Sequence, residues 1–430
     1  MTRLRLGRLT TAMALASLVL IGGPALADQS IRVAAEHTLS TTGSTRGTAY
    51  GSANKIITLG NRTHVAWLDT ASRTMIRTYD RETDQWLPTV HVGTGLDNHG
   101  GPAMCADSKG YLHMVFGPHH GPLQYVRSER ANDASSWVKL PGFGDHATYP
   151  SIVCDADDTL YCAYRGKTAP FRLLLQRKPK DGDWTEPKVI VDAGVPDGYT
   201  QFGNCLCLGP RGTLHLAFHV YDMHPAAGKA VGHLQSANRG DTWALADGTP
   251  VELPFTPDNE GWLVKDPEYD MRCWTVDCDT DGNPYVCIVK YGPEPREAQV
   301  WAFRSGAWGK IDTATALATT GQELKASGAT LAFDQTGNLY VAMSAGPKGG
   351  WSLPGNEIFV LVSSDRGKSF EVVPVSTPNP RVPNWLPSIE RATGHNLVSA
   401  PWLLYTHGEK GEGCTPADVT QIRAVRLQRD

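Results

Sequence analysis

Short runs in which apolar and polar residues alternate recur along most of the chain. In residues 112–116, for example, Leu112, Met114 and Phe116 fall on one side of an extended segment. An alternation of period two is typical of a β-strand, whereas a helix repeats about every 3.6 residues. These runs come in pairs joined by turns rich in Asp, Asn and Gly, and no stretch beyond the N-terminal segment has a helical period. The pattern predicts an all-β fold.

The strand pairs belong to a unit that repeats along the chain. Clear copies occupy residues 102–117, 150–165, 204–219, 274–290 and 329–344, and weaker copies begin at residues 54 and 387. A third strand and a turn closed by Trp or Phe follow the copies, and these aromatics recur every 47 to 65 residues between Trp86 and Phe370. A unit of this length has room for four short strands, and seven such units are typical of a β-propeller.

We therefore predict one domain over residues 28–430, a seven-bladed β-propeller of four-stranded antiparallel blades. Two stacked β-sandwiches are the alternative, although a sandwich does not require repeats of similar length in one phase. The preceding residues 1–27 have the basic start, apolar run and Ala25-Leu26-Ala27 ending of a signal peptide. A membrane anchor is the alternative, but the apolar run is shorter than the roughly 18 residues that a span needs. We expect removal after Ala27 and a secreted protein, extracellular or periplasmic.

Charge and cysteine content narrow the expected partners. The 430 residues carry 40 Lys and Arg against 44 Asp and Glu, so the basic surplus of a nucleic-acid-binding protein is missing. We expect no nucleic-acid or membrane partner and a monomer. Export permits disulfides, and Cys154 with Cys162 and Cys278 with Cys287 flank predicted tight turns. Cross-strand bridges and buried free thiols both remain open for these pairs.

Alignment of the repeats brings unlike polar residues to one rim of the predicted propeller. The start of the first strand and the end of the second strand of a blade lie at the same rim. The polar residues at these positions, or in the loop that leads to them, are His99, His119 or His120, Tyr149, Arg165, Tyr199, His219 and Tyr221. Most glycoside hydrolases need two carboxylates beside the scissile bond, and the nearby Asp97 and Asp145 do not suggest such a pair.

This set of side chains suits β-elimination from a uronic acid. A cation must neutralise the substrate carboxylate, a base must remove the proton on C5, and an acid must protonate the departing O4. Arg165 suits the carboxylate because a guanidinium can pair with it through two hydrogen bonds. Tyr149 beside a cation can act as the base, and His99 or His119 can act as a base or as a partner of the carboxylate.

Two groups of motifs resemble known families. Residues 236–243 and 363–370 follow the pattern Ser-x-[Asp/Asn]-x-Gly-x-[Ser/Thr]-[Trp/Phe], which resembles the Asp-box of bacterial-neuraminidase repeats. Residues 97–128 and 147–166 resemble the neuraminidase-repeat polysaccharide lyases, which include ulvan lyases and rhamnose–glucuronate lyases and are seven-bladed propellers. In that family two His of the second blade are followed by a Tyr-Pro pair and an Arg. The matching positions here are His99, His119, Tyr149 and Arg165.

The resemblance implies a role for each of these residues. Tyr149 would be the general base and acid, and Arg165 with one His would hold the carboxylate. His99 would be a second catalytic His, and His119 would neutralise charge or act as a base. We expect substrate contacts from the remaining rim residues, which are His120, Tyr199, His219 and Tyr221.

The elimination itself requires no cofactor. Some relatives hold a structural zinc through His and Cys, so a structural zinc or calcium ion stays open here. The candidate ligands are His219, His224, His233, Cys273 and Cys278, which lack tight ligand spacing. The expected function is a secreted lyase that cleaves a polysaccharide containing glucuronate or iduronate linked to rhamnose, as in ulvan, and leaves an unsaturated uronate.

Two other functions remain as alternatives. A sialidase-like hydrolase would share the Asp-boxes but would need an arginine triad and an early Phe-Arg-Ile-Pro motif. The similar run at residues 170–173 lies in the third repeat, too late in the chain. A non-catalytic glycan-binding propeller would stack sugars on loop aromatics such as Trp262, Trp351 and Trp385.

Overall fold

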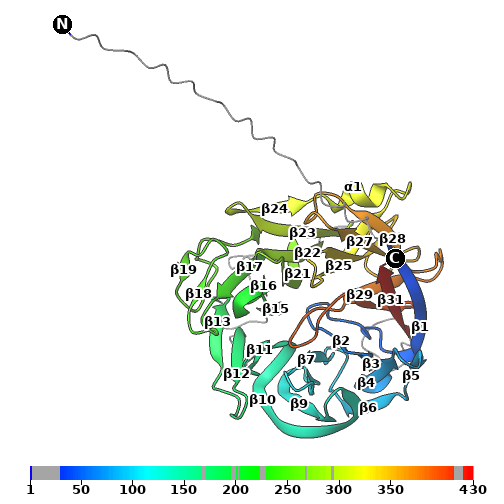
Figure 1. The fold of residues 1–430 in the computed structure, drawn as a ribbon, viewed down its shortest axis with the longest axis horizontal. Coiled ribbons are helices and arrows are strands. Elements are labelled where there is room, and N and C mark those ends of the chain that lie inside the picture. The colour runs from blue at the N-terminus through cyan, green and yellow to red at the C-terminus, as the bar shows by residue number, and fades with distance from the viewer. Residues whose placement is uncertain are drawn as a thin grey trace.

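The structure, a computed structural model, describes residues 1, 30–166, 171–194, 200–201, 203–222, 229–266, 269–291, 295–410 and 420–429. Apart from residue 1, the predicted signal peptide lies outside the described residues. Strands make up nearly all of the regular structure, and they pair antiparallel within five sheets (Figure 1). The predicted all-β class is therefore confirmed. No helix within the described ranges is long and apolar enough to cross a membrane.

The first sheet joins the two ends of the chain. Its strands are β1 (Ile31–Gly43), β2 (Ile56–Leu59), β3 (Arg62–Asp69), β4 (Arg73–Asp80), β5 (Gln85–Trp86), β6 (Val90–Thr94), β29 (Asn384–Ile389), β30 (Trp402–His407) and β31 (Thr420–Arg429). Strand β1 pairs with β31, with Ile31 opposite Arg429. The first and last described strands therefore lie side by side, while the other sheets follow one another around the middle of the view (Figure 1).

The second and third sheets hold the repeats that carry most of the predicted site. The second contains β7 (Ala103–Ala106), β8 (Leu112–Phe116), β9 (Gly121–Arg130), β10 (Asp133–Cys154), β11 (Leu160–Gly166), β12 (Arg172–Lys178) and β13 (Lys188–Asp192). The third contains β14 (Thr200–Gln201), β15 (Asn204–Leu208), β16 (Leu214–Asp222), β17 (Lys229–Ser236), β18 (Trp243–Ala244), β19 (Pro250–Val251) and β20 (Val264–Lys265). The long strand β10 pairs with β9 through its first part and with β11 through its second part.

The fourth and fifth sheets have four strands each. They are β21 (Asp270–Cys278), β22 (Pro284–Tyr291), β23 (Glu297–Arg304) and β24 (Ala307–Ile311), followed by β25 (Lys325–Phe333), β26 (Leu339–Gly346), β27 (Glu357–Ser363) and β28 (Glu371–Pro374). Strands such as β8 and β26 are buried along their whole length. Apolar residues on both faces of these strands pack against neighbouring sheets, and this burial stabilises the arrangement.

The Asp-box turns have a structural role. In the first, Asn238 Oδ1 accepts a hydrogen bond of 2.9 Å from the Thr242 amide, and the closing Trp243 is buried. In the second, Asp365 Oδ1 accepts a hydrogen bond of 2.9 Å from the Ser369 amide. The side chains thus satisfy turn amides and fix the turns that close two repeats.

The structure contains short helical elements that the sequence pattern does not predict. A short helix, α1 (Thr313–Ala318), lies at the outer edge of the molecule next to β24 and β28, and Asp312 caps it by accepting from the Thr315 amide. Six residues are too few to produce a helical period in the sequence, so the pattern missed it. Two short 3₁₀ turns, η1 (Thr70–Ser72) and η2 (Pro210–Gly212), complete the helical structure that the described ranges contain.

Of the two alternatives left open for these cysteine pairs, the described residues fit buried free thiols and contain no cross-strand disulfide. Cys154 lies opposite Leu160 and Cys162 opposite Ile152, so the two thiols are not register partners. In the fourth sheet, Cys278 pairs with Pro284 and Cys287 with Thr275. All four cysteines are free and buried.

Candidate active site

Several of the predicted rim residues meet at one cavity of about 390 Å³. His99, Tyr149 and His219 line this cavity, as the repeat register predicted. Segment 46–52, between β1 and β2, supplies a second part of the wall, and residues 272–274 of β21 supply a third. Residues from several different repeats therefore face one space.

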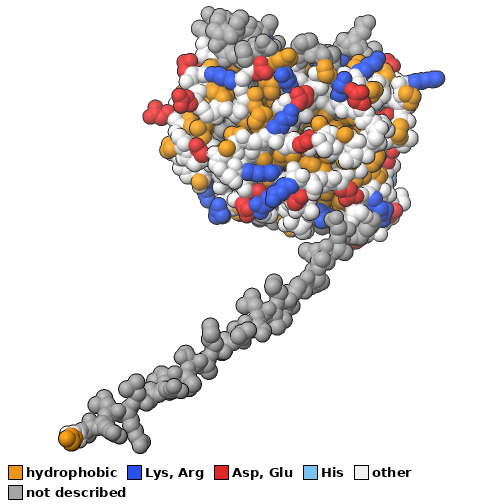
Figure 2. Space-filling model, turned by 90° about the horizontal axis from the view of Figure 1, so that it is seen from above, with side chains coloured by type: hydrophobic (Ala, Val, Ile, Leu, Met, Phe, Trp, Pro, Cys, Tyr) orange, Lys and Arg blue, Asp and Glu red, His pale blue; other side chains and the backbone are white. Residues whose placement is uncertain are grey.

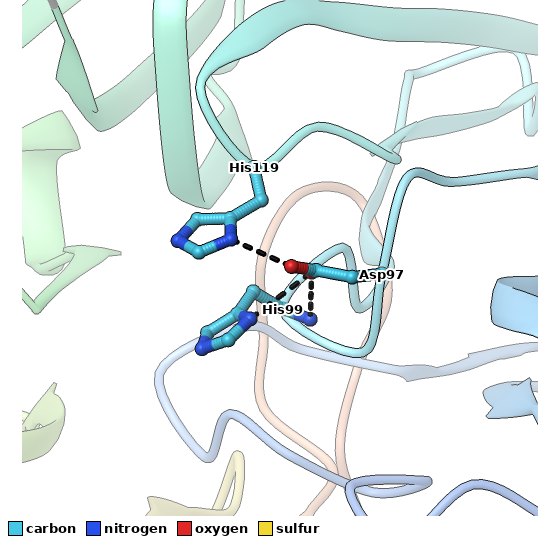
Figure 3. A group of neighbouring side chains, drawn as sticks. All are labelled: Asp97, His99 and His119. Carbon is cyan, nitrogen blue, oxygen red and sulfur yellow. Dashed lines mark hydrogen bonds and ion pairs between the residues drawn. The ribbon is translucent and has the colours of Figure 1, made fainter. Parts of the chain in front are cut away.

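Asp97 binds two of the predicted catalytic residues through its two carboxylate oxygens (Figure 3). Its Oδ1 lies 3.0 Å from Nδ1 of His99, and its Oδ2 lies 2.6 Å from Nδ1 of His119. The two imidazole rings stack with their centroids 4.0 Å apart. Because an ionised carboxylate only accepts hydrogen bonds, both histidines carry their proton on Nδ1. Asp97 therefore leaves each Nε2 as an acceptor when the ring is neutral.

Close contacts of the backbone hold His99 in place. The His99 amide donates to Asp97 Oδ1 at 2.8 Å. A Cβ atom added to Gly100 would lie 2.7 Å from the Gly117 carbonyl oxygen, and one added to Gly101 would lie 2.6 Å from that of Ala49. Only glycine permits such approaches without displacing the backbone. The two glycines thus bring the His99 loop against the loop between β8 and β9 and against segment 46–52.

Tyr149 lies in the cavity wall with an unusual backbone conformation. Its φ is +58°, which is uncommon for a residue other than glycine. Asn204 at the start of β15 donates to the Tyr149 carbonyl at 2.9 Å and supports this conformation. The Tyr149 ring packs edge-on against Tyr50, with centroids 4.9 Å apart, and its centroid lies 6.3 Å from that of His99. Such strained positions are frequent at functional sites.

Arg165 lies behind Tyr149, outside the set of residues that line the cavity. It is fully buried, and its guanidinium lies 5.0 Å from the ring centroid of Tyr149 and 4.8 Å from that of Phe171. It donates to Thr148 Oγ1 at 3.0 Å and lies 3.4 Å from His120 Nε2. The positive charge of Arg165 therefore acts directly on Tyr149. Arg46, which donates to the Tyr50 hydroxyl, lines the cavity itself.

The electrostatic environment keeps two histidines of this cluster neutral and Asp97 ionised. Burial lowers the pKa of His99, and Arg46 and His119 lower it further against the opposing effect of Asp97. Burial and Arg165 lower the pKa of His120 to about 4. Burial alone would raise the pKa of Asp97, but the hydrogen bonds from His119 and His99 outweigh it and hold this pKa well below its usual value. A neutral His99 can accept a proton on Nε2.

The remaining rim residues are His219, Tyr199 and Tyr221. His219 lines the cavity but is buried, and it accepts a hydrogen bond of 3.1 Å on Nδ1 from the Cys273 amide. Burial and Arg272 lower its pKa to about 3, so it is a neutral wall residue. Tyr199 and the side chain of Tyr221 lie outside the described residues.

The proposed zinc ligands do not come together where they are described. His219 contacts Cys273 through the backbone amide of that residue, whereas His233 Nε2 lies 3.2 Å from Nδ1 of His215. Cys278 Sγ lies 3.7 Å from Cys207 Sγ, and His224 is outside the described residues. Zinc sites need four such atoms around one point. The described candidate ligands therefore do not surround one point as a zinc site requires.

Two other groups of side chains have the spacing of metal ligands within the described ranges. One is Asp97, His99 and His119, in which both Nδ1 atoms are already hydrogen-bonded to the carboxylate. The other is Cys154, Asp158 and His395, in which Asp158 is hydrogen-bonded to Lys180 at 2.5 Å and to the Ser108 amide at 2.7 Å. In both groups hydrogen bonds within the protein satisfy the carboxylate, so a metal is not needed to explain either.

The repeat register missed several residues of the cavity. The cavity also contains Arg46, Tyr50, Arg272, Tyr291, Arg296, Trp351 and Lys410. Arg272 stands just before the fifth repeat begins at residue 274, the position that identified His99 and Tyr149, so the same rule could have found it. Figure 2 shows acidic and basic side chains intermixed on one side of the molecule, so the positive charge of the cavity is a local feature.

Comparison with known proteins supports the resemblance seen in the motifs. The model of the BNR repeat-containing family matches residues 62–316, which is more than half of the chain. The chain belongs to the BNR repeat-containing family. An ulvan lyase of Nonlabens ulvanivorans is 22% identical over 309 residues, covering 59% of this chain and 64% of the relative. An ulvan lyase of Alteromonas sp. (strain LOR) is 25% identical over 298 residues, covering 56% and 60%.

Solved structures have a similar fold. A PL25 ulvan lyase bound to -[GlcA(1-4)Rha3S]- superposes with a TM-score of 0.70 at 14% identity, over 90% of this chain and 94% of the other. The polysaccharide lyase Uly1 superposes with a TM-score of 0.60 at 12% identity, over 92% and 99%. The chain aligns with less than two thirds of the length of the curated relatives named above. The resemblance to polysaccharide lyases of this repeat family is confirmed.

Proposed function

We propose that this protein is a polysaccharide lyase that cleaves a chain at a uronic acid by β-elimination. The observation that carries the proposal is the cavity in which His99, Tyr149 and Arg46 meet. Asp97 orients His99 there and also binds His119. Similarity to proteins named ulvan lyases supports the same reaction and suggests a polymer of uronate and rhamnose. Among the described residues that line the cavity, none is a carboxylate, so the pair that a typical glycoside hydrolase needs is missing there.

The proposed reaction transfers one proton and breaks one C–O bond. Arg46 pairs with the uronate carboxylate, which makes the C5 proton more acidic. Tyr149 removes that proton, the C5–H electrons form the C4–C5 double bond, and the C4–O4 bond breaks. The departing O4 then takes a proton from the acid, which is Tyr149 itself when the sugar is glucuronate. The products are a new non-reducing end with an unsaturated uronate and a free hydroxyl on the other fragment.

The remaining residues support these steps. The buried charge of Arg165, 5.0 Å from the Tyr149 ring, favours the ionised phenol. In glucuronate the C5 proton and O4 lie on the same side of the ring, so Tyr149 can act as both base and acid. In iduronate they lie on opposite sides, so the unprotonated Nε2 of His99 is suited to take the C5 proton while the Tyr149 hydroxyl gives its proton to O4. His119 fixes Asp97 through its 2.6 Å contact.

The sheet connections support the seven-bladed arrangement that we propose for residues 28–430. Strand β10 can be divided between two four-stranded units, since it pairs with β9 through one part and with β11 through the other. Strand β1 can close the last unit beside β31. We also propose that residues 1–27 direct export and that the mature protein is a monomer. Mass spectrometry of the secreted protein and sedimentation would test these two points.

The test is ultraviolet absorbance of unsaturated uronate while purified polysaccharides are offered. Ulvan, which contains both uronates, should give a rise in absorbance with wild-type protein. Reducing sugar or free sialic acid without the absorbance would instead indicate a hydrolase. Binding without any product would indicate a glycan-binding protein. Polymers with only glucuronate or only iduronate would show which epimer is accepted.

A further inference from the structure

We infer that Arg391 and Lys55, two buried residues behind the proposed active site, are positioning residues that hold segment 46–52 in the shape that presents Arg46 and Tyr50 to the cavity. This inference rests on the proposed function, because it concerns how a wall of the same cavity is held. We call Arg391 and Lys55 the buried anchor pair. They are 1% and 0% exposed, and neither is among the residues that line the cavity.

Segment 46–52 lies between β1 and β2 and forms turns instead of a strand. The amides of Gly47, Ala49 and Ala53 each donate to the carbonyl three residues earlier. Buried carbonyl groups that no strand pairs must find donors elsewhere, because an unpaired polar group is costly in the interior. The shape of this segment therefore depends on side chains that donate to its carbonyl groups.

Arg391 supplies one such donor from the connection between β29 and β30. Its Nη2 donates to the Ser52 carbonyl at 2.6 Å, and its Nη1 donates to the Leu206 carbonyl in β15 at 3.3 Å. Strand β15 begins with Asn204, which donates to the Tyr149 carbonyl at 2.9 Å. A planar guanidinium can bind two acceptors in one fixed geometry. Arg391 thus ties the segment to the strand that supports the proposed base.

The backbone of Arg391 is itself fixed to the chain just after the segment. Asn54 accepts a hydrogen bond from the Arg391 amide on Oδ1 at 3.2 Å and donates from Nδ2 to the Arg391 carbonyl at 3.3 Å. One side-chain amide therefore bonds both polar backbone groups of Arg391. The guanidinium extends from a fixed point, so the position of the Ser52 carbonyl follows from it.

Lys55 holds the part of the segment that carries the aromatic ring. Its Nζ donates to the Tyr50 carbonyl at 2.6 Å and to the Ala53 carbonyl at 2.9 Å. The Tyr50 hydroxyl accepts a hydrogen bond of 2.9 Å from Arg46, and the Tyr50 ring packs edge-on against Tyr149. Burial lowers the pKa of Lys55 well below its usual value. A neutral amine still has two N–H groups, so both carbonyl groups can stay bonded.

A change at either anchor should therefore reach two groups of the proposed reaction. Arg46 pairs with the uronate carboxylate, and Tyr149 takes the C5 proton. A displacement of about 1 Å at a reacting group can lower a rate by about a hundredfold, even when the substituted residue is far from the substrate. The anchors touch neither substrate nor reacting atoms, so any loss has to pass through the segment.

The experiment is a double-mutant cycle between Arg391→Met and Arg46→Gln, with kcat/KM for the formation of unsaturated uronate from ulvan as the measurement. We expect Arg391→Met to lower kcat/KM by about 30-fold and Arg46→Gln by about 100-fold. Because Arg391 acts by placing Arg46, the double variant should match Arg46→Gln alone instead of multiplying the two losses. Arg391→Lys keeps a cationic donor and should restore part of the activity.

The matched control is Glu390→Gln. Glu390 is the preceding residue and is equally buried, but it accepts from the amides of Thr58 at 2.7 Å and Trp402 at 3.2 Å, outside the segment. This variant should have a lower melting temperature with unchanged kcat and KM.

Two further measurements keep the test decisive if Arg391→Met does not fold. Lys55→Met removes the other anchor and should lower kcat/KM by about tenfold, again with no further loss when it is combined with Arg46→Gln. Hydrogen exchange of a peptide that covers residues 46–53 reports on the segment without turnover. Exchange there should be faster in Lys55→Met and Arg391→Met than in Glu390→Gln.

Two results would overturn the inference. One is an unchanged kcat/KM for both anchor variants. The other is a double variant that loses the full product of the two single losses, because Arg391 would then act through the whole fold. If the wild-type protein forms no unsaturated uronate, the proposed function fails. Hydrogen exchange still tests the anchors in that case, and unchanged exchange of residues 46–53 in both anchor variants would overturn their role.

Discussion

Two cavities of similar volume differ in how their charges are balanced. We call the cavity lined by His99, Tyr149 and Arg46 the catalytic cavity, after its proposed function. It measures about 390 Å³, and a second cavity measures about 370 Å³. The described lining of the catalytic cavity has four cations and no acid. The second cavity has four of each, namely Asp107, Asp158, Asp181 and Asp183 with Lys109, Arg127, Lys178 and Lys180. Volume alone therefore does not distinguish them.

The two cavities differ in whether carboxylates lie among the described residues that line them. In the second cavity, Lys180 donates to Asp158 at 2.5 Å, and His113 lies 3.3 Å from Asp107. Charges paired in this way have little to gain from a ligand. In the catalytic cavity, none of the described lining residues is an acid, and Asp270, which pairs with Arg272 at 2.7 Å, lies outside the lining. An anionic substrate can therefore pair with Arg46 without competing with a carboxylate of the described lining.

Removal of the Tyr149 hydroxyl should have the largest effect on the reaction. Tyr149→Phe keeps the ring between Tyr50 and Arg165 but removes the group that takes the C5 proton. We expect the rate of unsaturated-uronate formation to fall by about 10³-fold, within the usual range for loss of a general base. The melting temperature should stay within a few degrees of wild type.

The matched change in the second cavity is Tyr111→Phe, because Tyr111 lines that cavity and also stacks with an arginine. It should leave the rate unchanged. Full activity of Tyr149→Phe would refute the assignment of Tyr149 as the base. An equal loss in both variants would mean that tyrosine substitution acts through the fold.

Replacement of the Asp97 carboxylate by an amide should have the next largest effect. In Asp97→Asn the uncharged amide has one oxygen and could not accept from both Nδ1–H groups, so His99 and His119 would lose their fixed tautomer. We expect kcat to fall by about 10²-fold, a typical contribution of a correctly oriented acid–base group. The acidic limb of the pH–rate profile should also move, since Asp97 raises the pKa of His99 in the wild type.

Asp158→Asn is the control for that change, because Asp158 is the paired carboxylate of the second cavity. It should leave kcat and the pH–rate profile unchanged while it lowers stability. A normal pH–rate profile with wild-type kcat for Asp97→Asn would show that Asp97 does not position the histidines.

Stability at low pH should depend on Asp158. Burial alone would raise its pKa, but hydrogen bonds from Lys180 and Ser108 lower it to about 2. Since this folded pKa is below the unfolded value, the contribution to stability is present above about pH 4 and is lost as the pH falls to about 2. Denaturant unfolding between pH 5 and pH 2 should show wild type losing about 1–2 kcal/mol more than Asp158→Asn. Parallel pH curves for the two proteins would contradict this.

Repeat register predicted which strand ends meet, but it could not predict side-chain direction. His99 and Tyr149 reached the cavity because both stand just before the first strand of a repeat. Arg165 also lies at the predicted rim, yet its side chain points behind Tyr149 and packs between two aromatic rings. Register fixes the position of Cα and leaves the choice of rotamer to the local packing.

Residues in irregular loops carry no signal from the repeats. Arg46 and Tyr50 lie in the segment between β1 and β2, before the weakest repeat, so no pattern marked them. In the sequence, Asp97 stands out only as a carboxylate without a partner for glycoside hydrolysis. Its actual partners are two histidines, one of them 22 residues away in sequence, and that contact depends on how Gly100 and Gly101 let two loops approach.

The smallest expected effect is that of Lys410, at the outer edge of the catalytic cavity. Lys410 is exposed and lies 5.5 Å from the Trp351 ring, so water and salt screen its charge. Lys410→Gln should raise KM for ulvan by about twofold at low salt, consistent with an exposed charge worth well below 1 kcal/mol, and should have no effect at high salt. Lys109→Gln, in the charge-balanced second cavity, is the control and should leave KM unchanged at every salt concentration. Initial rates in a series of salt concentrations measure both. An equal rise for both variants would mean that ulvan responds to the overall charge of the protein, and the contrast between the two cavities would then have no bearing on substrate binding.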